Sequence, residues 1–380
     1  MELILFSIVI FLLKFAVFIA SLLLIIFVHE MGHYLVGRWC GIGASAFSLG
    51  FGRELVGFTD KRGTRWKLCL IPLGGYVKFI GDEDPTSMPS VSGKELPKNA
   101  FFAASAWRRA LTVFAGPLSN GIFAIVIFTI FFISFGRYDI EPVAGQVLPN
   151  SPAAQAGIKS GDKIISLDGN PVYFFSEVQN YITLRSGDEV EVGIERNGNF
   201  ETVIVTPERV SEKNFLGREA QTGRIGIVVP LDPNEPNRID PQYIKRMTYG
   251  LLDSVGEAYK QSKLIVTQTF RFIGRLFVGR EDVNQLSGPI ATGQVAFIFM
   301  DMGVIQYINL LAFLSLSIGL INLFPLPPLD GGHLVFYLIE TFTGRKVPDR
   351  IQFLIFKIGF FVIIAFMIFV TFNDIGVFSW

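Results

Sequence analysis

Four long apolar stretches constrain the fold of this 380-residue chain more than any other feature. They run over about Leu3–Val36, Leu111–Phe135, Gly303–Phe324 and Ile351–Phe372, and Lys14 interrupts the first. Each comes close to or exceeds the ~20 residues that a helix needs to cross a bilayer. A buried soluble helix seldom keeps such runs. The sequence therefore predicts an α-helical integral membrane protein with about four transmembrane helices. The lipid bilayer is accordingly expected as one of its partners.

The charged residues exclude one class of partner and set an orientation. Lys and Arg number 33 against 33 Asp and Glu, so no basic face indicates nucleic acid. Residues 36–109, between the first two spans, hold eleven Lys or Arg against six Asp or Glu. Arg345, Lys346 and Arg350 lie between the last two spans. Because basic residues near a span favour the cytoplasm, both short connections are expected inside and the long insert between spans two and three outside.

The first part of this insert reads as a small β-rich domain. In "NSPAAQAG", Ser151 and Pro152 predict a helix start and Gly157 its end. "DKIISLDGNPV" predicts a strand and a turn, and "EVEVGIERNGNFETVIV" predicts a hairpin around Asn197-Gly198. Together these stretches resemble a bacterial PDZ domain over about 141–207. Such a domain either captures an extended peptide by strand addition or only covers the membrane core.

Two further features of the insert carry expectations. The loop that would hold a peptide carboxylate is expected near Val143–Val147. Farther along, apolar residues recur at helical spacing with Lys and Arg between them, which predicts an amphipathic helix on the membrane surface or against the small domain. These residues are Ile244, Met247, Leu251, Val255, Ala258 and Ile265.

The stretch "FVHEMGHYLV" places three ionisable side chains inside the first apolar run. His29 and His33 lie one helical turn apart, so both imidazoles can reach one zinc ion. Glu30 lies beside them and can take a proton from a water that the metal activates. Ionisable groups at membrane depth are expensive and by default functional. A shared divalent cation would offset the free-energy cost of burying them. The stretch therefore predicts a catalytic zinc site.

The third zinc ligand is expected after the third span, in "INLFPLPPLDGGH". Its prolines cannot continue a helix, so the backbone is predicted to unwind here near the inner side of the membrane. Asp330, followed by the flexible pair Gly331-Gly332, then presents a carboxylate to the site. His333, the third of only three histidines, competes for this place, and Asp330 is favoured.

These motifs together resemble the site-2 protease family of intramembrane zinc metalloproteases, of the bacterial RseP-like type. "HEMGH" and "NLFPLPPLDGG" carry the resemblance. Five further stretches add to it: "FSLGFG", "IPLGGYVKFIGDED", "AGPLSN", "LSGPIA" and "FND". The resemblance implies one Zn²⁺ per chain held by His29, His33 and Asp330, with Glu30 as catalytic glutamate. One PDZ-like domain is found where the best-known members carry two.

The resemblance also implies a location and a class of substrate. It implies a protease of the bacterial inner membrane with its active site toward the cytoplasm and its PDZ-like domain in the periplasm. Its partners would be single-span membrane proteins, such as an anti-sigma factor, or signal-peptide remnants, cleaved in regulated intramembrane proteolysis. The expected layout is 1–38, helix with HExxH; 39–107, cytoplasmic or re-entrant β-loop; 108–136, second helix; 137–210, PDZ-like domain; 211–302, amphipathic helix and connection; 303–334, third helix with unwound LDG segment; 335–380, fourth helix and C-terminus.

Substrate contacts are expected at two glycines and two amides. "RELVGFTDKRGTRWKLCLIPLGG" predicts a hairpin that turns at Asp60–Gly63. Its free edge, which ends at Gly74 and Gly75, could hold an extended substrate or merely plug the core. Asn120 and Asn322 lie in or beside spans and could bind substrate backbone. For Asn120, hydrogen bonding between helices is an equal alternative.

Two other functions remain open at this stage. A non-catalytic membrane adaptor would bind peptides through its PDZ-like domain and keep zinc only for structure. The presence of Glu30 argues against it, because a structural site has no use for that carboxylate. A zinc or ion transporter is disfavoured, since the polar residues gather on the inner side and no relay crosses the membrane.

Overall fold

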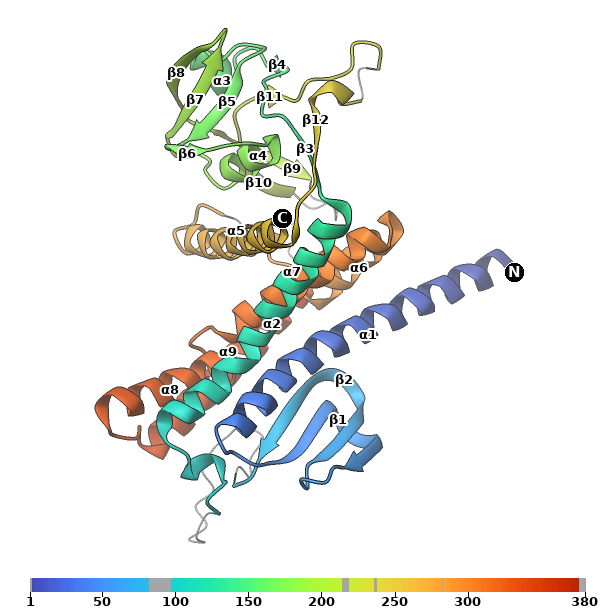
Figure 1. The fold of residues 1–380 in the computed structure, drawn as a ribbon, viewed down its shortest axis with the longest axis vertical. Helices are drawn as coiled ribbons and strands as arrows, with labels where there is room; N and C mark the ends of the chain where they lie inside the picture. The colour runs from blue at the N-terminus through green and yellow to red at the C-terminus, as the bar shows by residue number, and fades with distance from the viewer. Residues whose placement is uncertain (1, 82–96, 214–218, 236–237, 282, 376–380) are drawn as a thin grey trace. The chain divides into compact units, whose positions relative to one another are not determined.

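The computed structural model describes residues 2–81, 97–213, 219–235, 238–281 and 283–375 (Figure 1). The end of the stretch "IPLGGYVKFIGDED", 82–84, and the end of the expected segment 335–380, 376–380, lie outside the described residues. The chain divides into two compact units, Met1–Phe128 with Gly288–Val377 and Thr129–Ser287 with Phe378–Trp380. Each unit is built around its own set of elements.

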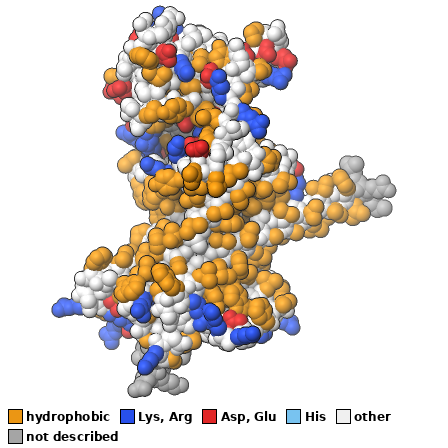
Figure 2. All heavy atoms as spheres, in the orientation of Figure 1, with side chains coloured by type: hydrophobic (Ala, Val, Ile, Leu, Met, Phe, Trp, Pro, Cys, Tyr) orange, Lys and Arg blue, Asp and Glu red, His pale blue; other side chains and the backbone are white. Residues whose placement is uncertain are grey.

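The first unit is mainly helical, and four of its helices match the expected membrane spans. Leu5–Trp39, Ala106–Phe135, Val304–Asn322 and Asp349–Asp374 are each long and apolar enough to cross a bilayer. This agrees with the predicted membrane protein. Figure 2 shows hydrophobic side chains over the visible faces of α1 and α2. The described helices that contribute to this unit are α1 (Glu2–Trp39), α2 (Ala106–Phe135, which continues into the second unit), α6 (Pro289–Met302), α7 (Val304–Asn322), α8 (Asp330–Thr343) and α9 (Asp349–Asp374).

Small residues let α1, α2 and α7 approach one another closely. A Cβ added at Gly32 would lie only 2.3 Å from the carbonyl oxygen of Ala115, and one at Gly319 only 2.8 Å from that of Pro117. The hydroxyl of Ser119 also donates a hydrogen bond of 2.8 Å to the carbonyl of Val28. Close packing through small residues is typical of helices in membranes. It fixes the backbone of α1 against that of α2.

Two helices of this unit differ from the expectation. The 14-residue helix α6 was not foreseen, because it is too short for a membrane span; it packs on α1, α7 and α9. The break after α7 is shorter than predicted. Asp330 is already the first residue of α8. Gly331 and Gly332 are helical rather than a flexible link, and a Cβ at Gly331 would meet the carbonyl oxygen of Leu323 at 2.3 Å.

The predicted hairpin is present as β1 (Ala44–Thr59) and β2 (Arg65–Phe79). Its two long strands bend, so that residues 46–49 pair with 75–78 on one side and with 65–68 on the other. In the described part of the chain, no further strand pairs with the outer edge of 75–78. Because β2 also packs on α1, this unit contains a free strand edge beside the helix that carries the histidines.

The hairpin tip is held by one carboxylate, that of Asp60. Its Oδ1 accepts hydrogen bonds from the backbone N–H groups of Arg62 and Thr64 at 2.8 and 2.9 Å. Its Oδ2 accepts one of 3.0 Å from Nε1 of Trp66. The bond from Trp66, followed by those from the backbone, holds the pKa of Asp60 below its ordinary value. The charged carboxylate therefore closes the predicted turn.

The second unit contains the expected β-rich domain. Its sheet has the order β6-β5-β7-β8, with buried Ile164, Val192 and Ile194 in the core beneath it. The predicted turns are confirmed, since Asp168 and Asn197 have φ of 47° and 51° and precede glycines at positive φ. The elements are α3 (Pro152–Gln155), β5 (Lys163–Leu167), β6 (Asn170–Pro171), α4 (Phe175–Thr183), β7 (Val190–Arg196) and β8 (Asn199–Val205).

Three two-stranded sheets complete this unit and change two expectations. Gln146–Val147 (β4) pairs with Ile227–Val228 (β11), and Val143 bridges to Lys163. The two ends of the expected carboxylate loop are thus each paired with another segment. Residues Ile244–Met247 (β12) pair with Arg137–Ile140 (β3), so the prediction of a helix over 244–250 was wrong. Glu208–Lys213 (β9) pairs with Glu219–Arg224 (β10).

The predicted amphipathic helix is confirmed as α5, Leu251–Phe277. Near its end, Arg275 is buried and donates hydrogen bonds to Asp188 Oδ2 at 2.9 Å and to the carbonyl of Ser186 at 3.0 Å. These partners lie in the loop between α4 and β7. The helix therefore packs against the small domain, as one of the two expectations stated.

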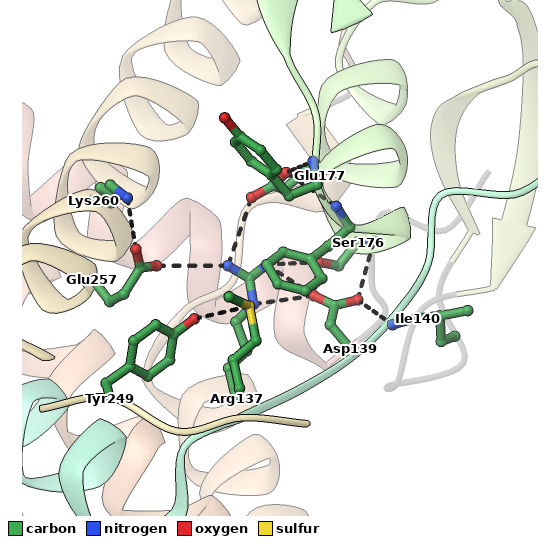
Figure 3. A network of polar contacts seen from close by, with 11 residues as sticks. Arg137, Asp139, Ile140, Ser176, Glu177, Tyr249, Glu257 and Lys260 are labelled. Atoms are coloured by element: carbon green, nitrogen blue, oxygen red, sulfur yellow. Dashed lines mark hydrogen bonds and ion pairs between the residues drawn. The ribbon is translucent and has the colours of Figure 1, made fainter. Parts of the chain in front are cut away.

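Figure 3 shows a polar network that ties α5 and α4 to strand β3. We call Arg137, Asp139, Ser176, Glu177 and Glu257 the Arg137 cluster. The guanidinium donates to Asp139 Oδ2 from Nε and Nη2, at 3.1 and 2.8 Å, and to Ser176 Oγ at 3.0 Å. Its Nη1 lies 3.6 Å from Glu177 Oε1 and 3.9 Å from Glu257 Oε2. One cation thus holds three carboxylates from three elements.

Candidate metal centre

The two histidines predicted to bind zinc lie side by side on α1. Their Nε2 atoms are 3.2 Å apart, and both residues are buried. Nδ1 of His33 donates a hydrogen bond of 2.9 Å to the backbone carbonyl of Thr112 on α2. Because a carbonyl oxygen can only accept, Nδ1 carries the ring proton. The lone pair of His33 is therefore on Nε2, the nitrogen that faces His29.

The carboxylate of Asp330 comes to the same point from 301 residues away in the chain. Its Oδ2 lies 3.0 Å from Nε2 of His29 and 3.4 Å from Nε2 of His33. The proline turn after α7 and the start of α8 place Asp330 there. His333 also faces the cavity, but its ring packs on Phe356 with centroids 4.6 Å apart. It is not among the converging donor atoms.

The separations of these three donor atoms fit a zinc ion. Bonds of about 2.0–2.1 Å to a tetrahedral zinc place its ligand atoms about 3.3–3.4 Å apart. The observed separations are 3.0, 3.2 and 3.4 Å. Two imidazole nitrogens and one carboxylate oxygen are also the donor types of catalytic zinc sites. The three residues therefore match a zinc ion in both the type and the spacing of their donor atoms.

Glu30 borders a cavity of about 320 Å³ next to the three donors. It is 8% exposed, and Val77 of β2 lines the same cavity. The cavity holds both polar and apolar groups. It is lined by Ile26, His29, Glu30, His33, Gly74, Gly75, Tyr76, Val77, Phe79, Phe101, Val113, Ile318, Asn322, Pro328, Asp330 and His333.

The candidate substrate contacts divide into two groups. Gly74, Gly75 and Asn322 line the cavity. Asn120 is fully buried and is not among the lining residues; its amide nitrogen instead lies 3.4 Å from Nδ1 of His29. The carbonyl of Thr112 was not foreseen, because a main-chain contact between distant helices leaves no signal in side-chain types.

Two helical histidines, a distant aspartate and an adjacent glutamate in a chain with membrane-spanning helices define the class of membrane zinc metalloproteases. More particularly, the chain belongs to peptidase family M50, the site-2 protease family, whose signature matches residues 17–366. The resemblance found in the sequence is thereby confirmed. The chain is a zinc metalloprotease, and Zn²⁺ is its cofactor.

Relatives in several bacteria match almost the full length of the chain. A Bartonella henselae protein named as a zinc metalloprotease is 49% identical over 352 residues, 93% of this chain and 98% of its own. A Brucella suis protein with a similar name is 46% identical over 363 residues, 94% of each chain. The metalloprotease MmpA of Caulobacter vibrioides is 32% identical over 393 residues, 95% of this chain and 96% of its own.

Among solved structures, we report one that is similar to part of the chain. It is the PDZ domain of an SdrC-like protein from Listeria monocytogenes, with 26% sequence identity. The match covers 24% of this chain and 88% of that one, at a TM-score of 0.19.

Proposed function

We propose that this chain is an intramembrane endopeptidase that cleaves the transmembrane segments of single-span membrane proteins or signal-peptide remnants. One observation carries the proposal. The three converging donor atoms and Glu30 surround one cavity, and the helix that bears three of these four residues is long and apolar enough to span a bilayer. A peptidase site at this position meets substrates that are themselves in the membrane.

The roles follow from the geometry of the side chains. His29, His33 and Asp330 hold the zinc ion, which when bound activates a water and polarises a peptide carbonyl. Glu30 takes the proton of the attacking water and returns it to the leaving amine. Its burial next to the cavity keeps the carboxylate away from bulk water.

The edge of β2 gives the substrate a place to become extended. A transmembrane helix hides its peptide carbonyls in its own hydrogen bonds, so it must unwind before attack. Residues 75–78 form a strand edge that is free in the described part of the chain, and Gly74 and Gly75 line the cavity. A Cβ at Gly75 would lie 3.0 Å from Cγ of Glu30. An added substrate strand would therefore pass directly beside the catalytic glutamate.

The placement in the membrane follows from the flanking charges. His29 is 15 residues from Lys14, or ~22 Å along the helix, and lies nearer the basic connection 36–109. We place the metal centre toward the cytoplasm and the β-rich domain, with its PDZ-like order of elements, in the periplasm. Cleavage would then fall near the cytoplasmic end of the substrate, as in regulated intramembrane proteolysis at a bacterial inner membrane. The hairpin would enter the bilayer from the cytoplasmic side.

A non-catalytic adaptor is not favoured as an alternative. The chain is aligned along more than nine-tenths of its length with relatives named as metalloproteases. Glu30 also borders the cavity beside the donors rather than solvent, as a catalytic carboxylate requires.

The direct test replaces Glu30 with glutamine in the full-length, detergent-solubilised protein. Glu30→Gln should retain zinc but cleave a transmembrane reporter at least ~100-fold more slowly, because general acid–base catalysis contributes about 10²–10⁴-fold. Glu201→Gln is the matched control, since its side chain is 46% exposed in the β-rich domain. Cleavage by Glu30→Gln at the wild-type rate would refute the assigned mechanism.

A second experiment tests the strand edge. Cys40 and Cys69 are the only cysteines, and replacing both by serine gives a background for a single Tyr76→Cys in the Glu30→Gln protein. Disulfide cross-linking to cysteines placed along a reporter should peak at one or two positions next to the scissile bond. Cross-links spread evenly along the reporter, or confined to its periplasmic end, would contradict substrate binding at this edge.

A further inference from the structure

Asn120 of α2 lies next to His29 but does not line the substrate cavity. Asn120 is 0% exposed on α2. Its amide nitrogen lies 3.4 Å from Nδ1 of His29, a long contact. Its amide oxygen is one of the few buried polar atoms of the described residues that has no hydrogen-bond partner. A buried amide oxygen without a partner loses its hydration with nothing in return, so it requires an explanation.

The two histidines differ in how their outer nitrogens are held. Nδ1 of His33 faces a carbonyl oxygen, which requires a proton on Nδ1 and leaves Nε2 free to bind a metal. Nδ1 of His29 faces an N–H donor, which requires that Nδ1 carry the lone pair. The ring proton is then on Nε2, where it points at Asp330 Oδ2, 3.0 Å away. In that tautomer His29 has no lone pair on Nε2 for zinc.

Rotation of one amide group removes this conflict. A turn of 180° about the Cβ–Cγ bond exchanges the oxygen and nitrogen of an asparagine without moving other atoms. The oxygen of Asn120 would then accept a hydrogen bond from Nδ1–H of His29. Both imidazoles would carry their protons on Nδ1 and direct their Nε2 lone pairs at the same point. A histidine that binds a metal usually donates its other N–H in this way.

We propose that Asn120 is a positioning residue that selects the metal-binding tautomer of His29 by presenting its amide oxygen to Nδ1. This inference rests on the proposed zinc ligands. With zinc held, the amide oxygen faces His29. Asn120 acts on the metal through His29 and from behind it, outside the substrate cavity.

Two substitutions separate this role from helix packing. A carboxylate in Asn120→Asp can only accept, so it fixes the proton on Nδ1 of His29, and zinc affinity should equal or exceed that of wild type. Asn120→Leu has a similar volume and no acceptor, and its affinity should fall about 10–100-fold. If Asn120 only joined helices, the order would be reversed, because leucine suits an apolar interface while an unpaired buried carboxylate does not.

The measurement is the Zn²⁺ affinity of the purified full-length variants by competition with a chromophoric chelator, which needs no peptidase activity. Ser315→Ala is the control, since Ser315 donates to the backbone carbonyl of Asn120 at 3.0 Å and its loss should leave affinity within about twofold. An affinity of Asn120→Asp below that of Asn120→Leu, or more than tenfold below wild type, would overturn the inference. Equal Zn²⁺ affinities of wild type, Asn120→Asp and Asn120→Leu would also overturn it.

Asp330→Ala distinguishes this inference from the proposed function. If Asp330→Ala binds zinc as tightly as wild type, the proposed ligand set itself is wrong. If Asp330→Ala loses zinc while Asn120→Leu keeps it, the ligand set stands and only the role of Asn120 fails.

Discussion

The metal centre and the Arg137 cluster both bury charged side chains, but they balance charge in different ways. In the Arg137 cluster the cation is part of the protein, and each nitrogen of the guanidinium faces a carboxylate or hydroxyl oxygen. At the metal centre, Asp330 forms ion pairs with His29 and His33 and, among the described residues, with no Lys or Arg. A cluster that contains its own cation holds a fold together. A cluster whose donor atoms converge without a Lys or Arg is a candidate site for a cation from outside.

The largest effect should come from removing Asp330, the one carboxylate among the three converging donors. Asp330→Ala should reduce zinc affinity by more than ~100-fold, because losing even a hydrogen-bond partner of a ligand costs about 10–100-fold. Proteolysis of a transmembrane reporter should fall with it. Arg137→Met, the counterpart in the other cluster, should retain the wild-type zinc content. Elemental analysis of the purified proteins measures both, and zinc loss in Arg137→Met would erase the contrast between the clusters.

The next effect comes from crowding the metal centre without removing a ligand. A Cβ at Gly116 would lie 2.2 Å from Nε2 of His33, whereas one at Gly121 would meet nothing within 4 Å. Gly116→Ala should therefore displace the imidazole and lower zinc affinity about tenfold or more, the range seen when a ligand loses its orientation. Gly121→Ala on the same helix should not. Equal zinc affinities in a chelator competition would show that the ring tolerates the added methyl group.

A moderate effect is expected from breaking the Arg137 cluster. Arg137→Met leaves Asp139, Glu177 and Glu257 without their shared cation. It should destabilise the second unit by about 1–3 kcal/mol. Arg238→Met, whose ion pair with Glu235 is 64% and 63% exposed, should change stability by less than about 0.5 kcal/mol. The rate of hydrogen exchange at the amides of Ile140 and Ser176 in the full-length protein measures how readily this part of the second unit unfolds. Matching exchange in the two variants would argue that the cluster does not stabilise this unit.

The smallest effect concerns the ion pair between Asp162 and Arg196 in the second unit. Burial raises the pKa of Asp162, but hydrogen bonds from Arg196 and from the N–H of Lys159 outweigh it and hold the pKa below its ordinary value. A carboxyl with a depressed pKa stabilises the fold above its unfolded pKa of about 3.9. This stabilisation is lost as the pH falls through the lower folded value. The stability difference between wild type and Asp162→Asn should be full at pH 7 and shrink below about pH 4, as measured by urea unfolding of the second unit.

The convergence of His29, His33 and Asp330 could be predicted from the sequence because zinc chemistry uses rare residue types. The whole chain has three histidines, and two of them lie one helical turn apart, so there are few ways to build a zinc site. The prolines before Asp330 mark where the third span must end. The membrane helices were predictable for a similar reason, since length and apolarity alone define them. Both signals are local or compositional.

The parts that could not be predicted depend on contacts between distant segments. Ile244 and Met247 fit the period of a helix, yet they form a strand because β3 offers a partner. The apolar helix α6 is too short for the length rule that reveals a span. The hydrogen bond of His33 to Thr112 involves a main-chain oxygen, which every residue possesses. In each case tertiary pairing overrides or bypasses what the side-chain pattern shows.

A single helix, α2, faces the outer nitrogens of both imidazoles, with Thr112 behind His33 and Asn120 behind His29. These two positions are eight residues apart, or ~12 Å along the helix axis. Sliding α2 by one turn past α1 would therefore withdraw both supports in one movement. The contacts that hold the two imidazoles from behind therefore both depend on one register between α1 and α2.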